Sequence, residues 1–233
     1  MQDSLAVIVA ARNEADRVGA TVAALRDAFP GAAIWVADDA SEDGTAEVAM
    51  TAGAQVVSRG RPHGKGANVT AAAEAALGAD PTPQLVLLCD GDLGACAGNL
   101  ALLVEAVERD ECDLAVAAFA RRVGGGFGFA LGFARWAIRR RCGLETTAPI
   151  SGQRAMRVAV LRAALPFARG YGMEVGMTID TVRAGHRLRE YELDLSHRAT
   201  GRTAAGFLHR ARQLRDFTRV YMATGGEPSR CGS

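Results

Sequence analysis

Short apolar runs that alternate with helix-like segments constrain the fold of this chain more than any other feature. The clearest run is Leu85–Leu93, LVLLCDGDL, in which apolar residues lead straight into two aspartates. A short apolar run bounded by turn residues is typical of a fully buried strand in a parallel sheet. Similar runs occur at Leu5–Ala10 and Ala33–Ala37, and helix-like segments follow them. The alternation predicts a single α/β domain with a mostly parallel sheet flanked by helices.

The rest of the first half continues this alternation. The further elements expected there are two strands, at 55–58 and 113–118, and three helices. One helix ends near Phe29, the second ends near Leu77, and the third spans 98–109. Another helix follows the acidic turn after the second strand. Ser41 or Asp43 is its expected N-cap, because short polar side chains accept hydrogen bonds from the first helical N–H groups.

The second half has a different character. It is rich in glycine and phenylalanine at first, and the segment 123–128 is a candidate either for a lid over a substrate or for an ordinary connection. The elements expected beyond it are a helix to Cys142, a strand at 153–158, a helix at 172–184, a strand at 187–195 and a helix at 204–223. We expect residues 1–120 and 121–223 to form two halves of one domain, and residues 224–233 to be a disordered tail.

The composition argues against several functional classes. A net charge of +1 is unlike that of a general nucleic-acid binder, which carries a large basic surface. The five cysteines include no CxxC pair, so neither a zinc site nor a disulfide framework is indicated, and free thiols are typical of a reducing cytosol. No signal peptide and no bilayer-spanning apolar run is evident, and we therefore expect a cytoplasmic protein.

Two carboxylates follow the central apolar run directly. Asp90 and Asp92 flank Gly91 where the strand is expected to end, and open α/β sheets bind ligands just beyond the carboxyl ends of their strands. The next basic residue in sequence is Arg109, so no neutralising charge lies close by in sequence. Paired carboxylates suit Mg²⁺ or Mn²⁺, which bridge them to phosphates. An ordinary turn is the alternative, since Asp and Gly are common in turns.

Four polar motifs carry a resemblance to a known family. They are Asn13-Glu14, Asp38-Asp39, Gly64-Lys65-Gly66 and Asp90-Gly91-Asp92. In this order they resemble the nucleotide-sugar half of a GT-A glycosyltransferase of the family 2 type, which implies a GT-A (Rossmann-like) fold. The residues that the resemblance implies for nucleotide-sugar binding are Ala11, Asn13, Glu14, Asp38, Asp39, Lys65, Asp90, Gly91 and Asp92. It also implies that Asp92, the second aspartate of the DxD motif, holds the metal.

Some of these residues have a purely structural alternative. Asp38 and Asp39 suit a base contact, and they also suit an acidic turn that caps the next helix. Lys65 lies between glycines that let a backbone approach a phosphate, but it is equally compatible with a solvated surface position. The loop does not match a Walker motif, which requires four residues between its glycines and Ser or Thr after the lysine.

The second half resembles glucosyl-3-phosphoglycerate synthases in three segments, Ala148–Gly152, Leu165–Phe167 and Gly170–Gly176. The resemblance implies acceptor contacts from four residues, Ser151, Gly152, Tyr171 and Glu174. It also implies a catalytic role for Glu174 and metal ligation by His197 beside Asp92 and Asp90. The alternatives are that Glu174 is an acid favoured by the helix dipole and that His197 is a surface residue.

The C-terminal part resembles dolichol-phosphate-mannose-synthase-type enzymes instead, from His197 to Arg202 and through the basic helix 204–223. The expected acceptor is therefore either a small phosphorylated molecule or a lipid-linked one. Arginines opposite aromatic residues make helix 204–223 a candidate for contact with the inner face of a membrane or with an acceptor phosphate. The alternative is a helix whose apolar face covers the core.

Together these observations predict a metal-dependent glycosyltransferase with Mg²⁺ or Mn²⁺ as cofactor. The expected reaction moves a hexose from a UDP- or GDP-linked sugar to the acceptor, with Asp92 at the metal and Glu174 near the acceptor. Glu174 is the base if the enzyme inverts the anomeric centre, and it positions groups if the enzyme retains it. The alternatives are a sugar-phosphate nucleotidyltransferase and a non-catalytic nucleotide-sugar-binding subunit. The donor sugar, the anomeric outcome and oligomerisation stay open.

Overall fold

The alternating apolar runs build one seven-stranded sheet in the computed structural model, in the order β3-β2-β1-β4-β6-β5-β7. The structure describes residues 4–119, 128–168, 170–195, 216 and 218–223. The strands are β1 Leu5–Ala11, β2 Ala33–Asp38, β3 Gln55–Ser58, β4 Leu85–Asp90, β5 Leu114–Phe119, β6 Arg154–Arg157 and β7 Leu188–Leu193. The helices are α1 Val18–Ala28, α2 Thr45–Thr51, α3 Lys65–Leu77, η1 Gly94–Leu100, α4 Ala101–Glu108, α5 Gly128–Cys142, α6 Val158–Ala164, η2 Gly170–Gly172 and α7 Met173–Arg183.

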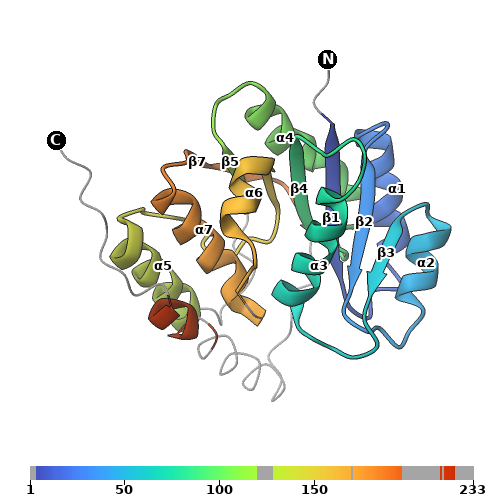
Figure 1. The fold of residues 1–233 in the computed structure, drawn as a ribbon, viewed down its shortest axis with the longest axis horizontal. Coiled ribbons are helices and arrows are strands. Elements are labelled where there is room, and N and C mark those ends of the chain that lie inside the picture. The colour runs from blue at the N-terminus through green and yellow to red at the C-terminus, as the bar shows by residue number, and fades with distance from the viewer. Residues whose placement is uncertain (1–3, 120–127, 169, 196–215, 217, 224–233) are drawn as a thin grey trace.

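The sheet is mostly parallel, as predicted, and helices cover both of its faces (Figure 1). β1 pairs in parallel with β2 and β4, β2 with β3, and β5 with β7. β6 runs antiparallel to both of its neighbours, β4 and β5. Because β6 comes from the second half of the chain and lies between two strands of the first half, the two halves share one sheet.

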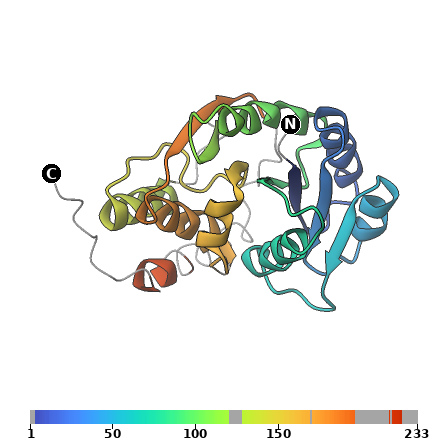
Figure 2. The ribbon, with the colours of Figure 1, turned by 45° about the horizontal axis from the view of Figure 1, so that its top comes forward.

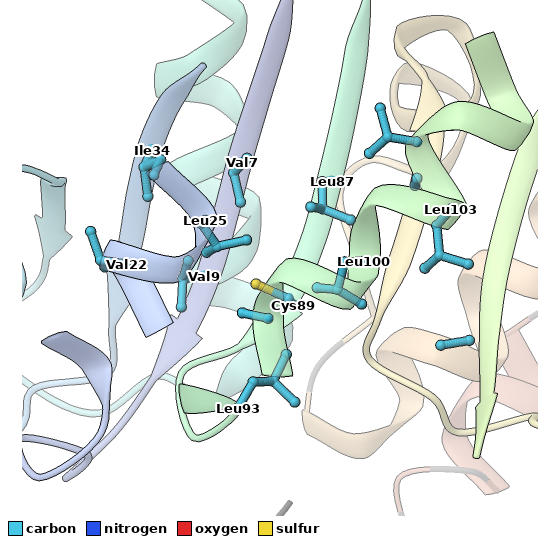
Figure 3. Close-up of a cluster of buried hydrophobic side chains, with 14 of the residues drawn as sticks. Val7, Val9, Val22, Leu25, Ile34, Leu87, Cys89, Leu93, Leu100 and Leu103 are labelled. Atoms are coloured by element: carbon cyan, nitrogen blue, oxygen red, sulfur yellow. The ribbon is translucent and has the colours of Figure 1, made fainter. Parts of the chain in front are cut away.

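Alternate residues of the central strands pack into different layers, because successive side chains of a strand point to opposite faces. Val7 and Val9 of β1 face α1, η1 and α4, where Leu25 is fully buried (Figure 3). Ala6 and Ile8 of the same strand face the opposite layer, formed by α3, α6 and α7. The buried apolar runs of the sequence therefore supply both layers of the core.

A third apolar cluster holds α5 against α7. Ala134 and Ile138 of α5 pack with Val175 of α7, and Val220 of the C-terminal segment, residues 218–223, completes the cluster. Figure 1 shows α5 and this segment side by side, and Figure 2 shows α5 and α7 running beside each other. α5 and the C-terminal segment thus both pack on α7.

Some predicted helix boundaries are wrong. The N-cap of α2 is Gly44, with a φ of 86°, and not Ser41 or Asp43. The side chain of Asp43 accepts hydrogen bonds from Thr45 and so serves the turn before the helix. The helix expected at 98–109 is a 3-10 turn, η1, followed by α4. The sequence prediction also missed α6, since its seven residues are too short to show a helical apolar period.

Several predicted features lie outside the described residues. They are the segment 123–127, His197, the tail 224–233 and most of helix 204–223. Within the described part of that helix, residues 218–223 are helical, as expected. None of the helices that the structure describes has the length and apolarity needed to cross a membrane.

The packing of β4 against α1 and η1 predicts a large effect of core truncation. Leu87 is 0% exposed in this layer, so Leu87→Ala should lower the free energy of unfolding by about 2–5 kcal/mol through lost burial and a residual cavity. The matched control is Leu102→Ala on α4, where the leucine is 54% exposed and the loss should be within about 0.5 kcal/mol. Urea unfolding monitored by circular dichroism measures both, and equal losses would contradict the assigned core.

Candidate active site

The carboxyl ends of β1, β2 and β4 lie together and bring three of the predicted motifs to one edge of the sheet. The N–H of Asp39, just after β2, donates to Ala11 O at 3.0 Å, and the N–H of Gly91, just after β4, donates to Ala10 O at 2.9 Å. Gly91 has a small neighbour in Ala11, which a Cβ atom at Gly91 would approach to 3.2 Å. The ends of the three strands are therefore fixed relative to one another by backbone hydrogen bonds.

Asp39 organises the glycine-lysine loop. Its carboxylate is buried and accepts hydrogen bonds from the N–H groups of His63 (2.7 Å) and Gly64 (3.1 Å) and from the side-chain amide of Asn68. These three donors lie before and within the first turn of α3, which begins at Lys65. Asp39 thus holds the start of α3 at the end of β2.

Lys65 bridges two carboxylates from distant parts of the chain. Its Nζ lies 2.6 Å from Asp90 Oδ1 and 2.9 Å from Glu174 Oε1. The Glu174 side chain is 7% exposed, and that of Lys65 is 29% exposed. Burial by itself lowers the pKa of Lys65, but the charges of Asp90 and Glu174 outweigh it, so that the pKa is raised. Lys65 is therefore a fixed cation at the site, and the solvated surface position is the wrong alternative.

A cation from another part of the chain, Lys65, neutralises Asp90. Its Oδ1 contacts Lys65, and its Oδ2 accepts a hydrogen bond from Gln153 Nε2 at 2.7 Å. The sequence places no basic residue close to Asp90, and the fold supplies one from 25 residues away. Sequence reasoning missed Gln153, because it comes 63 residues after Asp90 and belongs to no motif that was considered.

Gly152 allows this close arrangement. A Cβ atom at Gly152 would lie 2.6 Å from Lys65 Nζ and 2.8 Å from Asp90 Oδ2, which is closer than such contacts normally come. Neighbouring Ser151 is buried, and its hydroxyl donates to Gln153 Oε1 at 3.2 Å. The predicted Ser151-Gly152 pair is thus part of the same polar cluster as Lys65 and Asp90.

A buried arginine supports α7 from inside. Arg154 is 1% exposed, and it donates from Nε to Ser151 O (2.8 Å) and from Nη1 to Thr178 Oγ1 (3.0 Å). Thr178 in turn donates to Glu174 O at 2.9 Å. Burial lowers the pKa of Arg154 to about 10, while the nearby charges of Glu174 and Glu190 act in the opposite direction. Sequence reasoning placed Arg154 in a strand and assigned it no role.

The turn that carries Asp92 is held by α1. Thr21 Oγ1 donates to Gly91 O at 2.7 Å and accepts from the N–H of Gly94 at 2.8 Å. Arg17 Nη1 donates to Asp92 O at 2.9 Å, so a basic side chain also lies beside the backbone of this turn. Among the described residues, nothing forms a hydrogen bond or an ion pair with the half-buried carboxylate of Asp92. Asp92 is thus positioned by its backbone while its carboxylate stays available.

The remaining predicted nucleotide contacts form a hydrogen-bonded turn beside the site. Asn13 has a φ of 54°, its N–H donates to Ser41 Oγ (2.9 Å), and its Oδ1 accepts from the N–H of Glu42 (3.0 Å). Ser41 also donates to buried Asp38, and the N–H of Glu14 donates to Thr45 Oγ1 at 2.9 Å. These hydrogen bonds tie the segment after β1 to the segment after β2. Base or ribose contacts from this turn stay a prediction.

Two predicted site residues have no described side chain. Tyr171 lies in η2, directly before α7, but the structure describes only its backbone, and His197 lies outside the described residues. Among the side chains that the structure describes, no three His, Cys, Asp or Glu residues gather into a metal-binding group. The described acids at the end of β4 and in the first turn of α7 are Asp90, Asp92 and Glu174.

The fold is similar to that of solved glycosyltransferase structures. A complex of glucosyl-3-phosphoglycerate synthase from Mycobacterium tuberculosis with Mg²⁺ and UDP aligns with a TM-score of 0.78 and 24% identity, over 98% of this chain and 82% of that chain. A complex of the same enzyme with Mn²⁺, UDP-glucose and glycerol 3-phosphate gives a TM-score of 0.76, also at 24% identity, over 98% and 82% of the two chains. The expected GT-A-like fold is confirmed.

Sequence comparison identifies a relative with a different named activity, and it also identifies the family. An undecaprenyl-phosphate mannosyltransferase from Micrococcus luteus is 32% identical over 210 residues, which are 83% of this chain and 84% of the relative. The model of the family described as glycosyl transferase family 2 matches residues 6–164, which include the ends of β1, β2 and β4, Lys65 and Gln153. The chain therefore belongs to glycosyl transferase family 2, and it is a glycosyltransferase.

Proposed function

We propose that this glycosyltransferase moves a hexose from a nucleoside diphosphate sugar to a lipid-linked phosphate, with a divalent cation at Asp92. The observation that carries the proposal is the bridge from Asp90 through Lys65 to Glu174. It joins the strand end expected to hold the donor diphosphate to the first turn of α7, where the acceptor is expected. Because the chain belongs to glycosyl transferase family 2, we do not propose the nucleotidyltransferase alternative.

The residues at the end of β4 fit a divalent cation. Mg²⁺ is commonly held by one or two carboxylates together with substrate phosphates and water, so a group of three protein ligands is not required. The carboxylate of Asp92 is available for this role, whereas both oxygens of Asp90 are engaged by Lys65 and Gln153. Asp92 would therefore hold the ion directly, with Asp90 as its neighbour and His197 as the further proposed ligand. When bound, the ion neutralises the diphosphate leaving group.

Lys65 supplies a second positive charge at the same place. In the reaction an acceptor oxygen forms a bond to the anomeric carbon, and the bond from that carbon to the diphosphate breaks. The ammonium of Lys65 stays charged at neutral pH because its pKa is raised, so it reduces the repulsion that Asp90 and Glu174 would exert on the departing diphosphate. Its contact with Glu174 keeps the acceptor-side carboxylate at a fixed distance from the donor.

The acceptor decides what Glu174 does. A phosphate monoester has a second pKa near 6, so at neutral pH its oxygen is already an ionised nucleophile and needs no general base. A hydroxyl acceptor in an inverting reaction requires a base, and Glu174 is the acid placed for it. For a lipid-linked phosphate, Glu174 and Lys65 therefore position groups.

Sequence identity favours the lipid-linked acceptor over the small one. The relative with an undecaprenyl phosphate acceptor in its name is 32% identical, whereas the glucosyl-3-phosphoglycerate synthase is 24% identical despite its similar fold. The direct test incubates the enzyme and Mg²⁺ with UDP- or GDP-linked glucose or mannose and with either undecaprenyl phosphate or 3-phosphoglycerate. Transfer to the lipid phosphate supports the proposal. Transfer to 3-phosphoglycerate alone would replace it, and donor binding without transfer to either would oppose it.

The first prediction from the proposed function concerns the metal. Calorimetric titration with the preferred nucleotide sugar should show donor binding in Mg²⁺ or Mn²⁺ and a loss on the order of tenfold or more in EDTA, because the diphosphate then faces Asp92 without a cation. Asp92→Asn should weaken metal-dependent binding more than Asp90→Asn, and His197→Ala should weaken metal affinity without unfolding the chain. Full donor affinity in EDTA would remove the metal from the mechanism.

The second prediction concerns Glu174. Glu174→Gln keeps the size of the side chain and removes its charge, so kcat should fall on the order of 10²-fold while the donor Kd stays within about twofold. With a lipid-phosphate acceptor, the pH profile of kcat/KM should keep its shape in this variant. Asp180→Asn is the matched control, since Asp180 lies on the same helix and makes no ion pair with Lys65. A donor Kd that weakens as much as kcat falls would contradict the acceptor-side role.

The third prediction uses the raised pKa of Lys65. A lysine whose folded pKa is raised stabilises the fold fully below its unfolded pKa of about 10.4, and this stability is lost as the pH rises through the folded pKa. Lys65→Met should therefore cost about 1–3 kcal/mol of unfolding free energy, by the same amount at every pH from about 6 to 9. Urea titrations of both proteins across this range measure the difference. A difference that shrinks steadily between these limits would show that the bridge titrates there.

A further inference from the structure

The outward side of α5 carries an exposed tryptophan among arginines. Ala134 and Ile138 face the third apolar cluster, while Trp136 is 49% exposed on the other side of the helix. Arg139 and Arg140 follow one turn later and are exposed as well. Burying the exposed half of the indole against a partner would gain hydrophobic free energy. An exposed indole beside cations therefore makes this side of α5 a candidate interaction surface.

Aromatic rings from two elements gather around this tryptophan. The ring centroid of Trp136 lies 5.4 Å from that of Phe133 and 4.9 Å from that of Tyr221 in the C-terminal segment. The guanidinium of Arg141 lies 3.9 Å from the centroid of the Tyr221 ring. Met222, the next residue, is 65% exposed. The rings hold Trp136 in place, so its exposure is a feature of the packed structure.

The charges of this face have one sign. α5 contains four arginines and no acidic residue. The acid paired with Arg139 is Glu145, at 3.6 Å, and since both side chains are more than 70% exposed, the pair contributes little. Arg140 forms no ion pair with any described residue. We define the docking face as Trp136, Arg139, Arg140, Tyr221 and Met222.

The other large exposed apolar side chains lack this setting. Met50 is the sixth residue of α2, and Leu102 is the second residue of α4, whose last turn holds the ion pair of Glu105 and Arg109. Neither helix carries an aromatic residue or a run of arginines. The combination of an aromatic cluster with a run of arginines is therefore specific to α5 and the C-terminal segment within the described part of the chain.

We propose that the docking face binds the surface of an anionic lipid bilayer. Tryptophan and tyrosine rings suit the headgroup region, where one edge of the ring is apolar and the other is wet. Each arginine near an anionic bilayer surface contributes about 1 kcal/mol, and Met222 adds apolar contact area. The positive charge of the face matches the negative charge of such lipids and opposes a basic partner.

The docking face lies close to the acceptor side of the site without including it. α5 packs directly on α7, whose first turn carries Glu174, through Ala134 and Val175. In Figure 1, α5 and the C-terminal segment lie toward the end of the molecule to which the arrows of β2 and β3 point. A bilayer at this face would thus lie beside the carboxyl edge of the sheet. No residue of the docking face is assigned to donor or acceptor chemistry, so membrane binding is separable from transfer.

The test is flotation of the full chain with vesicles. One set is phosphatidylcholine alone, and the other is an equimolar mixture of phosphatidylcholine and phosphatidylglycerol. The wild type should float with the anionic vesicles, less so at high salt, and poorly with phosphatidylcholine. Trp136→Ala and the double variant Arg139→Gln/Arg140→Gln should each lower the partition coefficient about tenfold or more. Leu102→Ala and Arg162→Gln are the matched controls for an exposed apolar residue and an exposed arginine, and both should float like the wild type.

Thermal unfolding and donor binding are measured beside flotation. Thermal unfolding of each variant shows whether it is folded, and if Trp136→Ala is not, the double arginine variant decides. Failure of the wild type to float with anionic vesicles, or equal losses in the Leu102 and Arg162 controls, would overturn the proposal. So would a concentration-dependent dimer that is abolished by Trp136→Ala, because the face would then bind a second copy. Donor binding is measured in parallel, and it should be unchanged in every variant of the docking face.

Discussion

The contact on which the site depends is the ammonium of Lys65 between the carboxylates of Asp90 and Glu174. Asp90 ends β4 in the first half of the chain, and Glu174 begins α7 in the second half. Two carboxylates cannot approach each other at low solvent exposure without a cation between them, since their repulsion is weakly screened there. One lysine therefore sets the distance between the end of β4 and the start of α7.

The position of Lys65 depends in turn on other buried polar groups. Asp39 holds the loop in front of α3, Gln153 holds the second oxygen of Asp90, and Arg154 ties β6 to α7 through Thr178. Each of these side chains is less than a tenth exposed, where an unsatisfied polar group is costly. The network is specific because removing any one member leaves another without its partner.

The sequence indicates the strands and their polar ends well, because apolar runs such as Leu85–Leu93 carry a local signal. It identifies Lys65, Asp92 and Glu174 as candidates but not the bridge, since the contact of Lys65 with Glu174 spans more than a hundred residues. β6 is a four-residue strand with two arginines, and neither its antiparallel direction nor its place beside β4 has a local signal. The roles of Gln153 and Arg154 could not be predicted, because they follow from that placement.

The insertion of β6 between β4 and β5 affects how the chain can fold while it is being synthesised. β5 is complete before β6 has been made, yet the only sheet partners of β5 in the described structure are β6 and β7, which follow it. Until β6 has been made, β4 keeps one unpaired edge and β5 keeps two, and such edges template aggregation. The sequence of β5, LAVAAF, contains no charged residue that would oppose pairing at an exposed edge. The nascent chain is thus most exposed to misassembly before the second half has emerged, and a chaperone that covers β5 would act in that interval.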